Sequence, residues 1–340
     1  MLSVNDALSY DRDAIGIGRK GTIDRPYILK APFWTVDTLF YAIPREKVDL
    51  NYAFDIFQNI DWKKKDESTG VPSLSKTAIN DIDVLAPKHD EQQIIGQFFA
   101  AIDNLITLHQ RKFEKLTNVK KSMLEKMFPQ NGSSYPEIRF KGFTDPWEQR
   151  KLGDISEIKT GPFGSTLHAD DYVSDGTPII TTEHFKTGAL PRSKNGLPQV
   201  SDSDYKRLTA YTLDDGDIVF SRVGSVDINA LITPFQSNWL FSGRVLRVRP
   251  QTDISSKFLH TRLETESIKT DIRTRAVGQT MPSINTEILK ITPLVLPSSA
   301  AEQEQIGSYF AALDNLITLH QRELEKLQNI KKSMLEKMFV

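Results

Sequence analysis

Two segments of the sequence end an apolar run with a basic residue and a glycine, a pattern that can present hydrogen-bond donors to an anion or a nucleobase. They read AIGIGRKGTID (residues 14–24) and DIVFSRVGSVD (residues 217–227). Arginine and lysine donate to phosphates and to guanine edges, and serine and threonine bind phosphates or bases. A glycine there lets the backbone approach a ligand closely. Arg19 and Arg222 hold matching positions and are the leading candidates for a binding role.

The other chemistry-bearing residues form no catalytic or metal-binding pattern. The six histidines show no metal-ligand spacing, and cysteine is absent. No nucleotide-binding glycine loop is present, and GIGRKG (Gly16–Gly21) is a near-miss with the wrong spacing. Neither a S-adenosylmethionine site, nor an Asn-Pro-Pro-Tyr motif, nor an ordered group of carboxylates can be recognised. The sequence therefore predicts a non-catalytic chain without a cofactor or a metal.

The composition is that of a soluble globular protein with room for two domains. The chain has 340 residues, of which 39% are apolar and 26% charged, and its net charge is −1. It contains no apolar run of the roughly 20 residues needed to span a bilayer, and no secretion signal is recognisable. The absence of cysteine agrees with a cytoplasmic location. Because the net charge is so small, any nucleic-acid binding must rely on local positive charge or on partners.

One segment occurs twice, and the repeat dominates the organisation of the chain. DNLITLHQR is found at Asp103–Arg111 and again at Asp314–Arg322, and the similarity extends over Glu91–Phe128 and Glu302–Phe339. From the aspartate to the final phenylalanine, only four of the 26 positions differ, so 22 are identical. The two segments are therefore copies of one structural element.

Each copy is predicted to form a long amphipathic helix. It contains no proline and a single glycine near its start. In the first copy, apolar residues recur every three or four positions, at Ile95, Phe98, Ile102, Leu105, Leu116, Val119 and Met123. This heptad-like seam needs a partner helix, so the two copies are expected to pack antiparallel as a spacer roughly 57 Å long. His109 and His320 fall on the seam, where a packed residue that fixes register is favoured over a metal or catalytic role.

The similarity continues upstream in a weaker form. Val71–Gln92 aligns with Met281–Gln303, and both predict a Pro-Ser turn, a short helix and an apolar strand that ends in a proline. Ala14–Pro26 aligns with Asp217–Asn229, each an apolar strand running into a glycine turn. By this alignment roughly 55 residues of the second copy have no equivalent at the front of the first.

The second copy predicts a loop-rich α+β domain. WEQRKLGDISEIKTG, GTPIITTEHF, GDIVFSRVG and FSGRVLRVRP read as short strands between turns, and ISSKFLHTRLETESIKTDIRTRA reads as one helix with Ser255 or Ser256 as N-cap. PQNGSSYPEIRFKGFTDP (Pro129–Pro146) is predicted to be a linker.

The order of these motifs resembles the specificity (S) subunits of type I restriction-modification enzymes. The likeness rests on WEQRKLGDI at the start of the second copy, on TGVPSL and GQTMPSI before the helices, and on LP…EQ..I…F…LDNLI leading into them. Each motif is weak alone, but their order occurs twice and covers almost the whole chain. The resemblance implies two target-recognition domains, each a loop-rich mixture of small sheets and helices, separated by two long helices packed as an antiparallel coiled coil.

The resemblance also implies partners and a division of the chain. The globular parts would read two halves of a split sequence in double-stranded DNA, and the helices would dock methyltransferase (M) subunits, which a restriction (R) subunit joins. The expected segments are a partial first recognition domain (1–90), a first long helix (91–128), a linker (129–146), a second recognition domain (147–301) and a second long helix (302–340).

The candidate DNA-binding residues lie in loops that follow predicted strands. In the first copy they are Arg19, Lys20 and Thr22, and in the second they are Lys159, Thr160, Ser165, Thr166, Lys186, Arg192, Lys194, Ser221, Arg222 and Ser225.

Three alternatives remain open at this point. The first is a coiled-coil interaction protein whose globular parts bind other proteins. The second is a specificity subunit that has lost half of its recognition and acts with a second copy of itself. A fused restriction-methylation enzyme is the third, but it would require a catalytic domain that these 340 residues do not contain.

Overall fold

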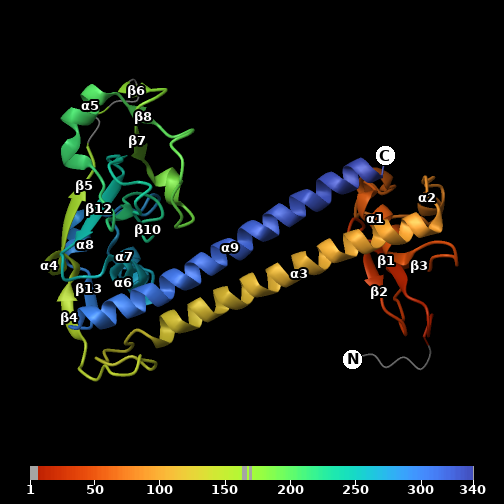
Figure 1. Cartoon of the computed structure of the whole chain (residues 1–340), viewed down its shortest axis with the longest axis horizontal. Helices are drawn as coiled ribbons and strands as arrows, with labels where there is room; N and C mark the ends of the chain where they lie inside the picture. The colour runs from red at the N-terminus through yellow and green to blue at the C-terminus, as the bar shows by residue number, and fades with distance from the viewer. Residues whose placement is uncertain (1–6, 163–166, 168–170, 340) are drawn as a thin grey trace. The chain divides into compact units, whose positions relative to one another are not determined.

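The computed structural model describes residues 7–162, 167 and 171–339. The chain divides into two units (Figure 1): unit 1 comprises Met1–Glu114 and Ile317–Val340, and unit 2 comprises Lys115–Leu316. Two long helices, α3 (His89–Lys126) and α9 (Ala300–Met338), run through both units. Each unit thus contains one end of each helix, and the two long helices predicted from the repeat are confirmed.

The two helices are antiparallel, and their contacts repeat with the partners exchanged. In unit 2, Lys120 of α3 pairs with Asp314 of α9, with 2.6 Å between nitrogen and oxygen. In unit 1, Lys331 of α9 pairs with Asp103 of α3 at 2.5 Å. Lys120 and Lys331 are the same position of the repeat, as are Asp103 and Asp314. The pairing is therefore isologous, as in a symmetric dimer joined into one chain.

The seam histidines meet in unit 1. The Nδ1 atoms of His109 and His320 lie 3.1 Å apart, and the rings cross at 64°. Aligned residues of an isologous pair meet only near its axis, so this contact fixes the register of the two helices. The predicted seam position is confirmed.

Each unit also receives the end of the other copy's helix. Phe128, which follows α3, packs in unit 2 against Phe258 and Phe310 with ring centroids 5.8 and 5.9 Å apart. Phe339, which follows α9, packs in unit 1 against Tyr52 and Phe99 at 5.4 and 6.0 Å. The duplicated helix ends thus complete both cores by the same aromatic contact.

The described residues of unit 2 form three small sheets. The first is antiparallel, in the order β10-β9-β12-β5, the second is mixed, in the order β11-β7-β8-β6, and the third pairs β13 with β4. Its strands are β4 (Glu148–Lys151), β5 (Ser156–Thr160), β6 (Tyr172–Val173), β7 (Thr177–Ile180), β8 (Gln199–Val200), β9 (Ile218–Ser221), β10 (Asn229–Leu231), β11 (Leu240–Phe241), β12 (Val245–Pro250) and β13 (Pro293–Leu296). Its helices are α4 (Leu152–Ile155), η3 (Thr182–Phe185), α5 (Asp202–Arg207), η4 (Thr209–Tyr211), α6 (Ser256–Leu263), α7 (Glu266–Arg275) and α8 (Thr286–Lys290).

Alternation along the central strands of unit 2 builds two cores. Ile218 and Phe220 of β9 face the larger cluster, which contains Phe258 of α6 and Phe310 of α9. Val219, between them, faces the smaller cluster toward the second sheet. Because neighbouring side chains of a strand point to opposite faces, β9 is apolar at Ile218, Val219 and Phe220 and is buried on both sides.

Unit 1 has a single three-stranded sheet, in the order β2-β1-β3, among its described residues. The strands are β1 (Ala14–Gly18), β2 (Tyr27–Leu29) and β3 (Leu39–Ala42), and the helices are α1 (Leu50–Asn59), η1 (Trp62–Lys65) and α2 (Lys76–Asn80). Ile17, Ile23, Trp62 and Leu74 form the core beneath the sheet.

The two units share the same glycine turn. Gly21 donates its N–H to Pro72 in unit 1, and Gly224 donates to Pro282 in unit 2, both at 2.8 Å. Both glycines have a positive φ, 90° and 83°, which residues with a side chain rarely adopt. β1 corresponds to β9, and β2 and β3 flank it as β10 and β12 flank β9. The alignment predicted from the sequence is therefore confirmed.

A buried glutamine ties each globular part to its helix. Gln92 accepts from the N–H of Asp49, the N-cap of α1, at 3.1 Å. Gln303 accepts from the N–H of Ser255, the N-cap of α6, at 3.0 Å. The Ser255 cap is as predicted.

Two predicted elements are wrong. The helix expected after Ser255 is broken into α6 and α7, because Thr265 donates to the carbonyl of Arg262 and begins a new helix. The apolar strand expected before Pro87 is not formed: residues 82–88 have no regular secondary structure, whereas the equivalent β13 pairs with β4. A strand needs a neighbour, and the described part of unit 1 offers none here.

Candidate nucleic-acid interface

The Arg222 turn lies at one end of the antiparallel sheet β10-β9-β12-β5 of unit 2. Arg222 follows β9, donates its N–H to the carbonyl of Arg244 at 2.9 Å, and donates from its guanidinium to the carbonyl of Gly243 at 3.2 Å. Its side chain is half-buried. Ser225, one residue after Gly224, is exposed at the tip of the same turn. The turn therefore holds one arginine in a defined position and presents a hydroxyl beside it.

Lys159 and Thr160 reach the same end of the sheet from β5. Thr160 lies opposite Leu246 of β12, which lies opposite Phe220 of β9. The Thr160 hydroxyl oxygen is buried and has no hydrogen-bond partner among the residues described. The structure thus brings the β5 and β9 candidates together, as strands of one sheet.

Two of these candidates have structural duties instead. Lys159 donates to the carbonyl of Ala210 at 2.8 Å and lies over the ring of Tyr211, with its nitrogen 4.9 Å from the centroid. Ser221 is buried and donates to the carbonyl of Val223 at 3.0 Å, which shapes the turn. Both side chains thus have partners within the protein, as the Arg222 guanidinium has in the carbonyl of Gly243.

Arg244 is a candidate that the sequence interpretation missed. It is exposed and adjoins Arg222 through the backbone hydrogen bond described above. The other arginines of FSGRVLRVRP are held by carboxylates: Arg247 by Glu157 at 2.8 Å and Arg249 by Asp217 at 2.7 Å. The useful signal was position, because Arg244 lies in the turn before β12 whereas the other two lie within the strand.

A second group of candidates lies in the long loop between β7 and β8. Lys186 is paired with Glu183, and Lys194 with Asp175. The hydrogen bond from Lys194 lowers the pKa of the Asp175 carboxyl. Exposed ion pairs of this kind contribute little to stability, so a DNA phosphate can replace the carboxylate as the partner of either lysine.

Arg192 of the same loop stacks on an exposed aromatic ring. Its guanidinium carbon lies 5.5 Å from the centroid of Phe235, which is 59% exposed. An arginine held over an aromatic face keeps its donors directed outward and retains its charge.

In unit 1 the matching turn carries Arg19, Lys20 and Thr22, all exposed. Arg19 donates weakly to the carbonyl of Asp37 at 3.4 Å and lies over Phe40 at 5.6 Å. Its guanidinium is thus less firmly placed than that of Arg222. Ser165 and Thr166 lie outside the described residues.

Within the described ranges, no group of three or more histidine, cysteine or acidic side chains could hold a metal ion. None of the helices in this part of the chain is both long and apolar enough to cross a membrane.

The sequence was compared with known protein families. The family described as the type I restriction modification DNA specificity domain matches residues 4–118 and 144–329, most of the chain. The chain belongs to this family of specificity subunits. It is 23% identical to the type I restriction enzyme MjaVIII specificity subunit of Methanocaldococcus jannaschii over 80% of the chain, and 21% identical to the MjaIX specificity subunit of the same organism over 92%.

These relatives are longer than the present chain. The chain spans 65% of the MjaVIII subunit and 73% of the MjaIX subunit. A related MjaX subunit is spanned to 60%.

Solved structures show the same fold. The S subunit of a type I restriction-modification system from M. genitalium matches 99% of this specificity subunit with a TM-score of 0.72 at 13% identity, and 85% of that chain is covered. A structure described as addressing complex assembly and conformational transition of the type I R-M system matches 96% of the chain, and 81% of that structure is covered, with a TM-score of 0.51. The predicted α+β architecture with two long helices is therefore confirmed.

Proposed function

We propose that this chain reads a split target in double-stranded DNA for a type I restriction-modification complex in the cytoplasm. Unit 2 reads one half-site through the sheet end at Arg222, and unit 1 reads the other through the turn at Arg19. Helices α3 and α9 set the spacing of the half-sites and dock methyltransferase subunits, through which a restriction subunit joins. Catalysis belongs to those partners.

The observation that carries the proposal is the recurrence of the same arginine-glycine turn in both units. Arg19 and Arg222 precede glycines of positive φ whose N–H groups make the same hydrogen bond. A scaffold that presents one arginine twice, in otherwise different surroundings, suits two readers of unlike half-sites. An arginine to a guanine edge contributes about 1–3 kcal/mol of discrimination.

Exposed apolar residues on the helices support the docking role. Leu108 and Leu319 hold the same repeat position in unit 1 and are 45% and 51% exposed. Apolar side chains left exposed on a long helix mark protein-protein contact surfaces more often than DNA contacts. Because the position occurs in both copies, it suits two identical partner subunits.

The experiment is to co-express the chain with its methyltransferase subunit and map methylated adenines across a genome. A gapped motif with two unlike halves is expected. Arg222→Ala should relax one half and Arg19→Ala the other, each by about 1–3 kcal/mol in preference for the contacted base. Arg275→Ala, which removes only a helical pair with Asp271, is the control and should leave the motif unchanged.

Other outcomes distinguish the alternatives. A gapped palindrome would assign both half-sites to unit 2 of two paired chains. Methylation that is absent although the complex assembles would leave the chain as a docking protein without recognition, and would overturn the proposal.

A further inference from the structure

One stretch of unit 2, residues Ser134–Thr160, covers three surfaces of that unit in succession; it is called the covering segment below. Its first contact is with the ends of α3 and α9. Arg139 donates two hydrogen bonds to Glu302, at 2.7 and 2.9 Å, and Trp147 donates to the same carboxylate at 3.3 Å. Phe140 packs on Tyr309 with ring centroids 6.0 Å apart. Glu302 is consequently 1% exposed, a buried carboxylate that its arginine satisfies.

The end of α3 is held by the same part of the covering segment. Ile138 donates its N–H to the carbonyl of Lys126 at 2.9 Å, and Lys126 pairs with Glu137 at 2.6 Å. The segment thus presents an acidic residue, a backbone donor, an arginine and an aromatic residue in direct succession.

The segment then adds two strands. Its β4 pairs with all four residues of β13, and its β5 pairs with β12 over five residues. Leu294 and Leu296 of β13 are buried as a result. β12 thereby has a neighbour on each side, β9 and β5.

Unit 1 carries the counterparts of these three surfaces, and they lie open. Glu91, Phe98 and Lys337 are the repeat equivalents of Glu302, Tyr309 and Lys126, and all three are exposed. Ile330 and Met334 of α9 are exposed, whereas their equivalents Val119 and Met123 are half-buried in unit 2.

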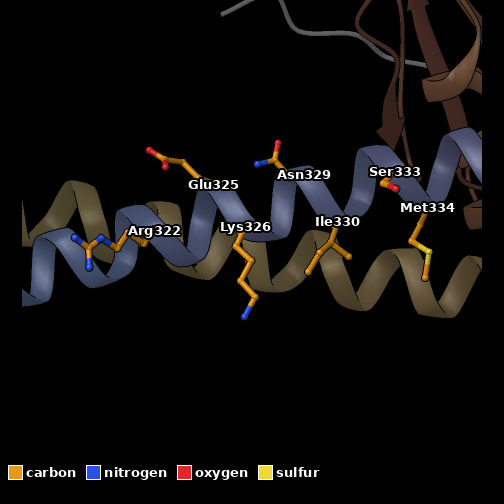
Figure 2. Close-up of a pocket in the computed structure, with 7 residues that line it drawn as sticks. All are labelled: Arg322, Glu325, Lys326, Asn329, Ile330, Ser333 and Met334. Atoms are coloured by element: carbon orange, nitrogen blue, oxygen red, sulfur yellow. The ribbon is translucent and has the colours of Figure 1, made fainter. Parts of the chain in front are cut away.

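Ile330 and Met334 project from the same side of α9 (Figure 2) and line a shallow surface hollow of about 670 Å³. The hollow is lined by residues of α9 alone, and its polar residues include Arg322, Glu325 and Lys326. Exposed apolar side chains with polar neighbours are common where a protein surface binds another segment.

The two strand-accepting surfaces of unit 1 are open as well. Val84 and Leu85, in the stretch equivalent to β13, are 51% and 87% exposed. β3, equivalent to β12, pairs with β1 alone in the described part of unit 1. Its Tyr41 is exposed where the equivalent Arg247 is buried. A bare strand edge with apolar side chains is a template for an added strand.

From these three surfaces we infer that unit 1 binds a peptide segment with the chemistry of residues 134–160. An arginine of that segment pairs with Glu91, an aromatic residue packs on Phe98 and Met334, and an acidic residue pairs with Lys337. Two short strands then add to residues 83–86 and to β3. The charges of the acceptor match those that hold the covering segment in unit 2. Residues 134–160 of the same chain are not the occupant, because they are bound in unit 2. The inference does not depend on DNA reading.

The test uses a fluorescein-labelled synthetic peptide of residues 134–160, titrated with the full chain and followed by fluorescence anisotropy. One saturable site per chain is expected. Met334→Ser or Phe98→Ser should weaken binding at least tenfold, and Leu316→Ser, an exposed position of α9 outside this hollow, should leave it unchanged. Hydrogen exchange should slow at residues 39–42 and 83–86 on binding.

A charge exchange tests the pairing itself. Glu91→Arg should weaken binding of the natural peptide at least tenfold, and a peptide carrying Arg139→Glu should restore it. Binding that Tyr309→Ser weakens while Phe98→Ser does not would mean that the peptide displaces the segment of unit 2, and would overturn the inference. No binding by a chain with wild-type circular dichroism would overturn it too, as would a chain dimer that the peptide dissociates, since a second copy would then be the occupant.

Discussion

Units 1 and 2 share a set of structural elements, but unit 2 has further elements that unit 1 does not show among its described residues. Both have the glycine turn, the buried glutamine and the three strands around β1 or β9. Unit 2 adds the covering segment and a second sheet, and its central strands are buried on both faces. Unit 1 leaves the corresponding edges exposed. The shared elements attach each globular part to the helices, and the added elements enlarge the globular part of unit 2.

The largest expected effect compares one aromatic position in the two cores. Phe310 and Phe99 are repeat equivalents, and both are fully buried. Phe310 belongs to the large cluster of unit 2, but Phe99 belongs to a small one. Phe310→Ala should lower the stability of unit 2 by about 4 kcal/mol and Phe99→Ala that of unit 1 by about 3 kcal/mol, because a small cluster collapses more easily around the cavity.

Hydrogen exchange at β9 and at β1 measures these losses separately. Leu319→Ala, at an exposed position, is the control and should change stability by less than about 0.5 kcal/mol. Equal losses in both units would show that the two cores are equally rigid.

A second comparison sets Asp55 of α1 against Thr261, its equivalent in α6. Asp55 is 1% exposed, and burial raises the pKa of its carboxyl from 3.8 to about 8, against the opposing charge of Lys331. Thr261 satisfies its hydroxyl by donating to the carbonyl of Lys257 at 2.8 Å. Unit 1 thus keeps a titratable group where unit 2 has a neutral one.

The pKa of Asp55 in the folded protein lies above its value in the unfolded chain. Its contribution to the free energy of unfolding is therefore full below about pH 3.8 and is lost as the pH rises through about 8. Unit 1 should lose about 2 to 3 kcal/mol between pH 6 and pH 8, and Asp55→Thr should remove that loss. Exchange at α1 measured at both pH values tests this. Asp81→Asn, at an exposed position, should leave the pH dependence of unit 1 stability unchanged. If that pH dependence persists in Asp55→Thr, another group is responsible for it.

The contrast also shows what the sequence could predict. The duplicated sequence predicted the helix pair and the seam positions of His109 and His320, because apolar residues recur at helical spacing in both copies. The turn at Gly21 and Gly224 was predictable since a basic residue before glycine recurs in both copies. These features are local or repeated, and both are visible in one sequence.

Features that depend on distant partners were not predictable. Residues 83–86 have the composition of a strand, yet no strand forms because the described residues provide no neighbour. Lys194 is paired with Asp175, 19 positions away, and Ser221 is turned inward by a buried strand. The DNA contacts stay predictions, and the structure adds that the backbone geometry of the two glycine turns is the same.

The smallest expected effect concerns the histidine pair at the centre of the helices. With 3.1 Å between the Nδ1 atoms of His109 and His320, one ring must donate and the other accept, so one must be neutral. Burial, then the nearby His109 and Lys112, lowers the pKa of His320. The contribution of His320 to the free energy of unfolding is therefore full at a pH above 6.5, the pKa in the unfolded chain. It is lost as the pH falls through the lowered pKa of the folded protein.

Solvent screens this half-buried pair, so the loss between pH 7 and pH 5 should stay below about 1 kcal/mol. Replacing both histidines by leucine should abolish it, as measured by exchange of the helix amides around residue 109. Lys112→Glu gives α3 the residue that α9 has at Glu323. By placing an anion beside the imidazoles it should raise the pKa of His320 and reduce the acid loss. If Lys112→Glu has no effect while the leucine variant does, contact between the two rings, rather than the charge beside them, controls the acid response.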